Sequence, residues 1–98
     1  MTFFLLEAYV PGSSGGDLVA LTKRLGDAAH ALSKGGLPVR YLRSTYVPED
    51  ETCFHCVEAS TASIAACLAE RAQLSFDRIL ETRNAAVSSG RVDGDAVT

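Results

Sequence analysis

The sequence predicts an α+β fold in which four strands and two helices follow the order strand, helix, strand, strand, helix, strand. Three observations lead to this prediction. Residues 41–59 form two strand-like runs on either side of a charged turn that begins at Pro48. A long stretch with helical spacing of apolar residues follows the first strand-like run, and a shorter one follows the third. This order is the split βαβ pattern, in which both helices cover one face of an antiparallel sheet.

The first strand is expected over Phe3–Val10, where a run of apolar residues is interrupted only by Glu7 and ended by Pro11 and Gly12. Successive side chains of a strand point to opposite faces, so every second residue shares a face. One of the two sets is wholly apolar and should meet the helices: Phe4, Leu6, Ala8 and Val10. The other set contains Glu7 and should lie on the opposite face.

A helix is expected from about Gly15 to Lys34. Ser14 and Asp17 have the spacing of a capping box, with an acidic side chain in the first turn, where the helix dipole favours it. Gly35 and Gly36 predict a left-handed end to this helix. Its apolar stripe consists of Leu18, Leu21, Leu25, Ala28 and Leu32.

Two further strands are expected over Val39–Val47 and Thr52–Ala59, joined by the acidic turn. Ser60 should cap a second helix. The apolar side of that helix is expected to carry Ile64, Cys67 and Leu68, so Cys67 is predicted to belong to the core.

A fourth strand is expected from Phe76 to about Thr82. The stretch from Asn84 to Thr98 shows no periodicity and contains Gly, Ser and Asp clusters, which predicts a mobile tail. The sequence therefore predicts one ferredoxin-like domain over residues 1–83 and a disordered C-terminal tail over residues 84–98.

Right-handed crossovers place the first and third strands side by side in the centre of the sheet. The face away from the helices is then left bare, and Phe3, Leu5 and Phe54 are expected on it. Exposed apolar area on a small sheet predicts a partner, most simply a second copy of the chain. We therefore expect a homodimer of the α+β barrel type.

The bulk composition narrows the choice of partners. The 98 residues carry a formal net charge of -3, so the chain lacks the basic surface that nucleic acid requires. No apolar run reaches the length of a membrane span, and the N-terminal residues carry no basic segment of the signal-peptide kind. Three cysteines are an odd number and predict no disulfide framework. We therefore expect a cytoplasmic protein that binds neither nucleic acid nor a membrane.

Glu7 and Glu58 each interrupt an apolar central strand, and both should lie on the bare side of the sheet. Neighbouring carboxylates repel each other unless a cation or a proton lies between them. The sequence leaves three candidates open: a bound metal ion, a shared proton, or an arginine of the adjacent strand, Arg40 or Arg43. An ion-pair network at a dimer interface requires no ligand at all.

Cys53, His55 and Cys56 supply thiolate and imidazole, the donors that nickel, zinc and copper prefer. Strand geometry places Cys53 and His55 on one face and Cys56 on the other, so all three reach one ion only if the strand bulges. The alternative is that Cys53 and Cys56 pack as small apolar residues and that His55 is a neutral histidine with its hydrogen bonds satisfied. His30 should lie on the outer side of the first helix, in solvent.

The same residues resemble a known bacterial family. The matching runs are Arg40–Phe54, Val57–Ala59 and Phe76–Ile79, and the most specific segment is YVPEDETCF at residues 46–54. They resemble DUF4242, a family first defined as a domain of unknown function and later described as nickel-binding. The match extends from Phe3 to about Glu81. The resemblance implies a ferredoxin-like fold, a homodimer and nickel binding, and it assigns no ligand residues.

Three hypotheses about function follow. The first is a small homodimeric protein that binds a metal, with nickel the leading ion, through some of five residues: Glu7, Cys53, His55, Cys56 and Glu58. The second is a dimeric interaction module without a ligand. The third is a small enzyme like the cofactor-poor monooxygenases or isomerases, with a small molecule in the sheet cleft and Glu7 or Glu58 as its base.

Overall fold

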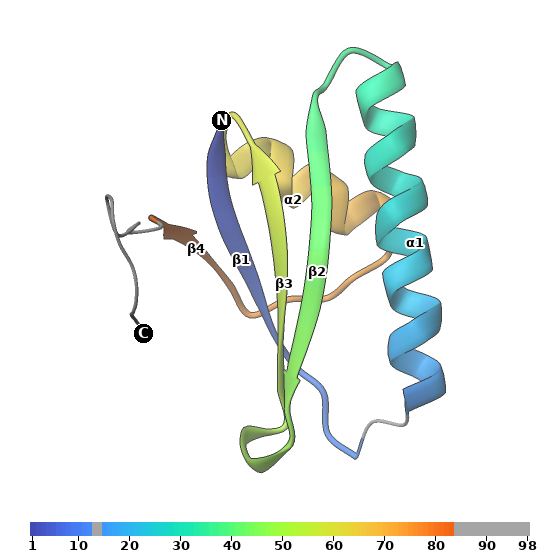
Figure 1. Cartoon of the computed structure of the whole chain (residues 1–98), viewed down its shortest axis with the longest axis vertical. Coiled ribbons are helices and arrows are strands. Elements are labelled where there is room, and N and C mark those ends of the chain that lie inside the picture. The colour runs from blue at the N-terminus through green and yellow to red at the C-terminus, as the bar shows by residue number, and fades with distance from the viewer. Residues whose placement is uncertain (13–14, 84–98) are drawn as a thin grey trace, which may run out of the picture.

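A computed structural model describes residues 1–12 and 15–83, without the side chains of residues 15 and 16. The helices and strands occur in the predicted order (Figure 1). They are β1 Thr2–Tyr9, α1 Gly15–Lys34, β2 Val39–Val47, a short 3-10 helix η1 Pro48–Asp50, β3 Thr52–Ala59, α2 Ala62–Arg71 and β4 Arg78–Thr82. The predicted tail, residues 84–98, lies outside the described residues.

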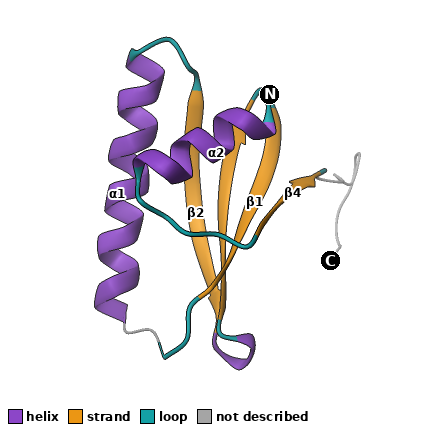
Figure 2. Cartoon of the chain, turned by 180° about the vertical axis from the view of Figure 1, so that it is seen from behind, coloured by secondary structure: helices purple, strands orange, loops and turns teal. Residues whose placement is uncertain are grey.

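The four strands form one antiparallel sheet in the order β2-β3-β1-β4. The prediction that the first and third strands lie in the centre is confirmed. Both helices lie on one side of the sheet, where α2 crosses the strands and α1 runs beside β2 (Figure 2). This is the arrangement of a ferredoxin-like fold.

The hydrophobic core lies between the sheet and the two helices. As expected from the strand pattern, Phe4, Leu6 and Ala8 of β1 are at most 4% exposed. Fully covering a large apolar side chain such as Leu6 contributes about 1.5–3 kcal/mol. The largest contributions to the core from the helices and from β3 are Leu25, Leu68 and Val57, each with an exposed fraction of 0%.

Cys67 is exposed, so its placement in the core was wrong. The buried stripe of α2 consists of Ala65, Leu68 and Ala69, and Ala72 continues it beyond the helix. The apolar side predicted from Ile64, Cys67 and Leu68 was therefore rotated around the helix axis relative to the side that is buried.

Both ends of α2 are fixed by local hydrogen bonds. The capping residue is Thr61 and not the predicted Ser60, because Thr61 has an extended backbone and its hydroxyl accepts a hydrogen bond from the Ile64 N–H at 3.2 Å. At the other end Gln73 adopts a left-handed conformation with φ 58°, and the Leu74 N–H donates to the Ala69 carbonyl at 2.8 Å.

The predicted end of α1 is confirmed. Gly36 has φ 97°, and the Leu37 N–H donates to the Leu32 carbonyl at 2.9 Å, as in a Schellman motif. The Gly36 N–H donates to the Ser33 carbonyl at 3.2 Å. The predicted N-terminal cap, Ser14, lies outside the described residues.

The charged turn between β2 and β3 is fastened to the end of β1. Glu51 has φ 48°, and its carboxylate accepts hydrogen bonds from the Gly12 N–H at 3.0 Å and from the Tyr9 hydroxyl at 3.3 Å. The negative charge of Glu51 raises the pKa of Tyr9. The Val10 N–H donates to the Glu51 carbonyl at 2.7 Å. The turn therefore holds the chain that leaves β1 on its way to α1.

Three strand boundaries differ from the prediction. Strand β1 begins at Thr2 and ends at Tyr9, not at Phe3 and Val10, and β4 begins at Arg78 and not at Phe76. Asp77 explains the late start of β4, because its carboxylate accepts the Tyr9 N–H at 2.8 Å in place of a carbonyl. Within the described residues, no helix is long and apolar enough to span a membrane.

Candidate functional site

The bare face of the sheet is the first candidate site. Residues opposite each other in an antiparallel ladder share a face, so the registers define three rows across β2, β3, β1 and β4. The rows are Arg40–Glu58–Phe3–Thr82, Arg43–Cys56–Leu5–Leu80 and Thr45–Phe54–Glu7–Arg78. The prediction that Phe3, Leu5 and Phe54 lie on the bare face is confirmed.

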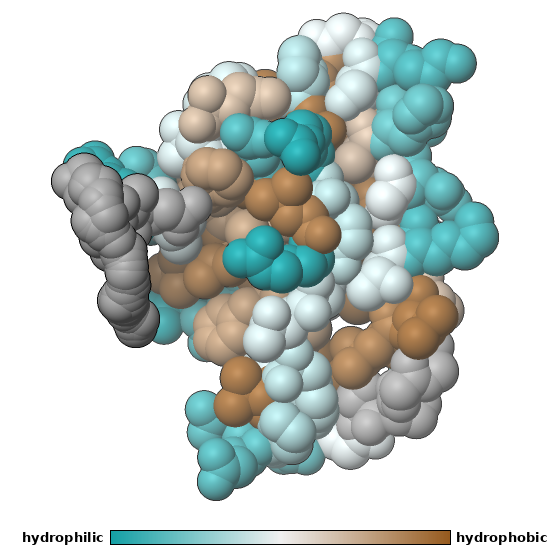
Figure 3. Space-filling model, in the orientation of Figure 1, coloured by the Kyte–Doolittle hydropathy of each residue, from teal (hydrophilic) through white to brown (hydrophobic). Residues whose placement is uncertain are grey.

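Apolar side chains form a diagonal band across this face. Phe3, Leu5, Phe54 and Leu80 are partly exposed, whereas Cys56 is 8% exposed. In the space-filling view of the same side, hydrophobic surface lies over the middle of the sheet and hydrophilic groups interrupt it (Figure 3). The bare face thus combines an apolar centre with a charged margin.

The two central carboxylates lie on the bare face as predicted, but they do not form a common site. Glu58 is in the first row and Glu7 in the third, so about four strand residues, or about 13 Å, separate them. Each is paired with an arginine of an edge strand: Arg40 Nη1 lies 2.9 Å from Glu58 Oε1, and Arg78 Nε lies 2.6 Å from Glu7 Oε1. Of the predicted cations, Arg40 is therefore confirmed.

Arg78 was missed because the facing of the fourth strand could not be assigned from its pattern. Arg43 is exposed, and it makes no ion pair with any described residue. The two ion pairs lie at diagonally opposite corners of the bare face.

The thiol and imidazole groups of β3 are divided between the two faces, as strand geometry predicted. Cys53 and His55 lie on the helix-covered side, where both have an exposed fraction of 0%. Cys56 lies on the bare face beside Leu5. The bulge that would have brought all three together does not occur in β3. Instead, the register shift falls between Tyr41 and Arg43 of β2.

This bulge in β2 creates a buried chain of hydrogen bonds that the sequence did not reveal. Without the extra residue, Tyr41 and Ser44 would point to opposite faces; with it, both point toward the helices. The Tyr41 hydroxyl lies 2.5 Å from Ser44 Oγ, and Ser44 Oγ lies 2.6 Å from His55 Nδ1. No Gly or Pro marks the bulge, so only the packing of tyrosine and serine beside His55 indicates it.

Burial controls the protonation of this chain. Burial lowers the pKa of His55 to about 4, so the ring is neutral near pH 7. His55 Nε2 is buried and has no hydrogen-bond partner among the described residues. Burial also raises the pKa of the Cys53 thiol and of the Tyr41 phenol. Both Cys53 and Cys56 are buried, as the alternative interpretation expected, but His55 is not the satisfied histidine of that interpretation, because Nε2 has no partner among the described residues.

The described residues of a single chain do not bring together enough metal-binding side chains to hold a divalent ion. Within residues 1–12 and 15–83, no three side chains among His, Cys, Asp and Glu are close enough to hold one metal. Cys53 and His55 form a pair, with Cys53 Sγ 3.9 Å from His55 Nδ1. Glu7 and Glu58 lie on the other face and are held by arginines. These donors do not fit a nickel site within one chain, because nickel normally binds more ligands than two.

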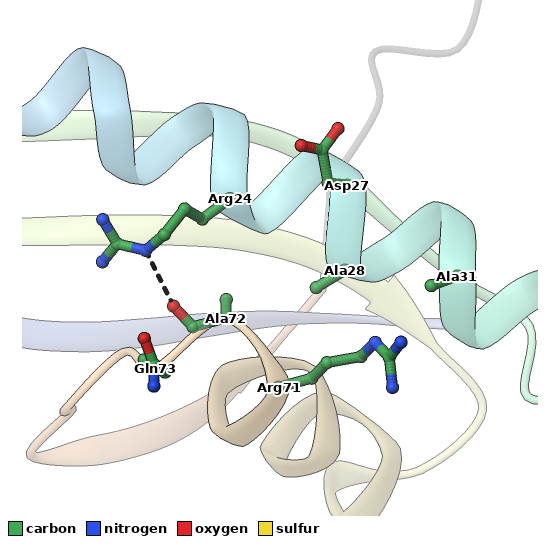
Figure 4. Close-up of a pocket in the computed structure, with 7 residues that line it drawn as sticks. All are labelled: Arg24, Asp27, Ala28, Ala31, Arg71, Ala72 and Gln73. Atoms are coloured by element: carbon green, nitrogen blue, oxygen red, sulfur yellow. Dashed lines mark hydrogen bonds between the residues drawn. The ribbon is translucent and has the colours of Figure 1, made fainter.

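A groove of about 370 Å³ between α1 and the end of α2 is the second candidate site (Figure 4). Arg24 Nε donates a hydrogen bond to the Ala72 carbonyl at 3.0 Å, which satisfies a carbonyl group at the end of α2. The guanidinium groups of Arg24 and Arg71 point toward opposite ends of the groove. They therefore do not converge on one ligand, and Arg24 has a structural role that explains its position.

A second groove, of about 280 Å³, lies between α1 and β2 and is lined in part by His30 and Tyr41. The prediction that His30 is in solvent is confirmed, since its side chain is exposed on α1. No second titratable group of α1 joins His30 in the lining of this groove.

Comparison with protein-family models and with curated proteins finds no match. Among solved structures, this chain is similar to the crystal structure of SCO4226 from Streptomyces coelicolor A3(2). The two sequences are 21% identical, the alignment covers 86% of this chain and 99% of that chain, and the TM-score is 0.65. At this identity the similarity shows the fold alone. Membership in DUF4242 therefore stays a prediction.

Proposed function

We propose that this chain functions as a homodimeric interaction module, in which the bare face of one copy packs against the bare face of a second. The observation that carries the proposal is the diagonal apolar band formed by Phe3, Leu5, Phe54, Cys56 and Leu80. An apolar centre with a polar margin is the usual composition of a protein interface.

Burial energy supports this association. Full burial of a large apolar side chain contributes about 1.5–3 kcal/mol, and the phenylalanines and leucines of the band are partly exposed in one chain. A second copy covers their remaining exposed area, so each contributes a fraction of that value. Summed over two copies, such fractions can outweigh the entropy lost on association.

The charges of the bare face are compatible with a two-fold contact. The Arg40–Glu58 pair and the Arg78–Glu7 pair lie at opposite corners. Each carboxylate is paired within its own chain, so bringing two bare faces together places no unpaired carboxylate in the interface. Arg43, which makes no ion pair with a described residue, lies at the outer end of the second row, on the edge strand β2. In a drier environment these ion pairs become stronger, because charges interact more strongly where water is excluded.

Substitution on the bare face tests the proposal. We expect the wild-type protein to sediment with the mass of two chains at about 10 µM, within the usual micromolar affinity range. Leu5→Asp should give the mass of one chain, because the carboxylate would be buried without a cation. Val19→Asp is the matched control, since Val19 is 69% exposed on α1, and it should remain a dimer. A Leu5→Asp protein that stays dimeric while circular dichroism shows it folded would contradict the proposal.

Binding of a metal, with nickel the leading ion, is a second candidate function. The observation in its favour is the proximity of Cys53 Sγ and His55 Nδ1, 3.9 Å apart. A nickel site would need more donors than these two. Isothermal titration with Ni²⁺ tests this candidate, and binding weaker than about millimolar would end it.

The enzyme hypothesis has less support. It needs Glu7 or Glu58 as a base, but the arginines Arg78 and Arg40 neutralise both carboxylates. Both carboxylates are therefore already engaged in ion pairs within the chain.

A further inference from the structure

Cys53 and His55 lie two residues apart on β3 and point into the space between the sheet and the helices. Both have an exposed fraction of 0%. Cys53 Sγ and His55 Nδ1 are 3.9 Å apart, and His55 Nε2 has no partner among the described residues. The homodimer proposed above uses the opposite face of the sheet and does not involve this pair.

We propose that Cys53 and His55 form a buried site for one monovalent soft metal ion, Cu(I) above all. The site lies inside a single chain and uses two protein donors, the Cys53 thiolate and the His55 Nδ1 nitrogen. Soft thiolate ligands select Cu(I), and imidazole also suits copper. Cu(I) and Ag(I) accept two-coordinate environments, in contrast to Ni²⁺ and Zn²⁺.

The separation of the two donor atoms lies between the values expected for linear and for tetrahedral coordination. With about 2.3 Å to sulfur and about 2.0 Å to nitrogen, the values for zinc, a linear site separates the two donor atoms by about 4.3 Å and a tetrahedral site by about 3.5 Å. The separation of 3.9 Å between Cys53 Sγ and His55 Nδ1 corresponds to an angle of about 130° at an ion with those bond lengths. An ion can therefore contact both donors at this separation once the Ser44 hydroxyl, 2.6 Å from His55 Nδ1, has moved away from that nitrogen.

The charge balance favours a monovalent ion over a divalent one. A thiolate, a neutral imidazole and Cu(I) together carry no net charge, so the complex can lie in an apolar core without a counterion. The same donors around Ni²⁺ or Zn²⁺ would leave one positive charge buried, which is strongly unfavourable without a partner. The described residues supply no third His, Cys, Asp or Glu to remove that charge.

Binding requires one proton to leave and one hydrogen bond to rearrange. The Cys53 thiol releases its proton to solvent as the sulfur–copper bond forms, so the oxidation state of the metal does not change. The Ser44 hydroxyl, 2.6 Å from His55 Nδ1, gives up that contact and keeps the Tyr41 hydroxyl at 2.5 Å. Coordination at Nδ1 places the ring hydrogen on Nε2.

A titration in a chain with a single thiol tests the site. The double substitution Cys56→Ala and Cys67→Ser removes the other two thiols: Cys56 lies on the opposite face of the sheet from His55, and Cys67 is exposed on α2. This protein is titrated without oxygen with Cu(I), in competition with bicinchoninate. We expect one Cu(I) per chain. Adding His55→Phe should lower the affinity for Cu(I) by at least about 100-fold, which is the largest loss usual when only a residue that supports a metal ligand is changed. Cys53→Ser should abolish the binding.

Two results of the titration would overturn the proposal. One is the absence of Cu(I) binding to the folded single-thiol chain, and the other is equal affinity with and without His55. If His55→Phe does not fold, X-ray absorption of the Cu(I)-loaded single-thiol chain decides instead: one sulfur and one nitrogen neighbour support the site, and sulfur alone contradicts it. Ni²⁺ binding to this pair as tight as that of Cu(I) would contradict the charge argument. The mass of the protein is a separate measurement, so failure here leaves the dimer proposal standing.

Discussion

Burial of His55 should make this protein less stable in acid. Burial lowers the pKa of His55 in the folded chain to about 4, whereas the ordinary value is 6.5. Above pH 6.5 neither the folded nor the unfolded chain protonates the ring. Between pH 6.5 and about 4 the unfolded chain binds a proton that the folded chain does not, so the free energy of unfolding falls as the pH falls.

The size of the effect follows from the gap between the two pKa values. A gap from 6.5 to about 4, at about 1.4 kcal/mol per pH unit, gives a loss of about 3 kcal/mol between pH 7 and pH 4. This is a large fraction of the total stability of a small domain. Because His55 has an exposed fraction of 0%, little screening by water reduces the effect.

Urea unfolding between pH 4 and pH 7, at one chain concentration, measures this loss. His55→Leu removes the titrating group and should show a loss smaller by about 3 kcal/mol than that of the wild type. His30→Gln is the matched control, because His30 is exposed on α1, and it should follow the wild type. Parallel curves for wild type and His55→Leu would refute the argument, since carboxylates titrate in both proteins.

Three further substitutions test local features of the fold by urea unfolding. Gln73→Gly should raise the free energy of unfolding by about 1 kcal/mol, because Gln73 has φ 58° and glycine adopts that conformation without strain; a loss of stability would contradict this. Thr61→Ala should lower it by about 1 kcal/mol and Ser60→Ala by much less, which checks that Thr61 is the cap of α2. Leu68→Ala should lower the free energy of unfolding by about 2–5 kcal/mol, whereas Cys67→Ala should change it by at most about 0.5 kcal/mol. Similar losses for the two variants would show that Cys67 belongs to the core after all.

The strand faces could be predicted from the sequence because alternation is a strong signal in β1 and β3. Glu7 and Glu58 were placed on the bare face, and Cys53 and His55 on one face with Cys56 on the other, from period two alone. The acidic turn fixed where the second strand ended and the third began. The α+β order and the central position of β1 and β3 followed from the chirality of the crossovers.

The partners of these residues could not be predicted, because they depend on register. The Arg78–Glu7 pair requires the alignment of β4 with β1, and the mixture of apolar and charged residues in β4 did not show which of its residues share a face. The Tyr41–Ser44–His55 chain depends on a bulge in β2 that no Gly or Pro announces. A one-residue slip turns every later side chain of a strand to the other face, so patterns within single strands do not contain this information.

Sedimentation equilibrium of the wild-type protein between about 1 and 100 µM, a range that spans typical micromolar affinities, tests the central claim most directly. That claim is that the apolar band of the bare face, with Leu5 at its centre, is covered by a second copy of the chain. We predict a mass that rises with concentration to that of two chains and goes no higher. A mass of one chain throughout this range would contradict the claim.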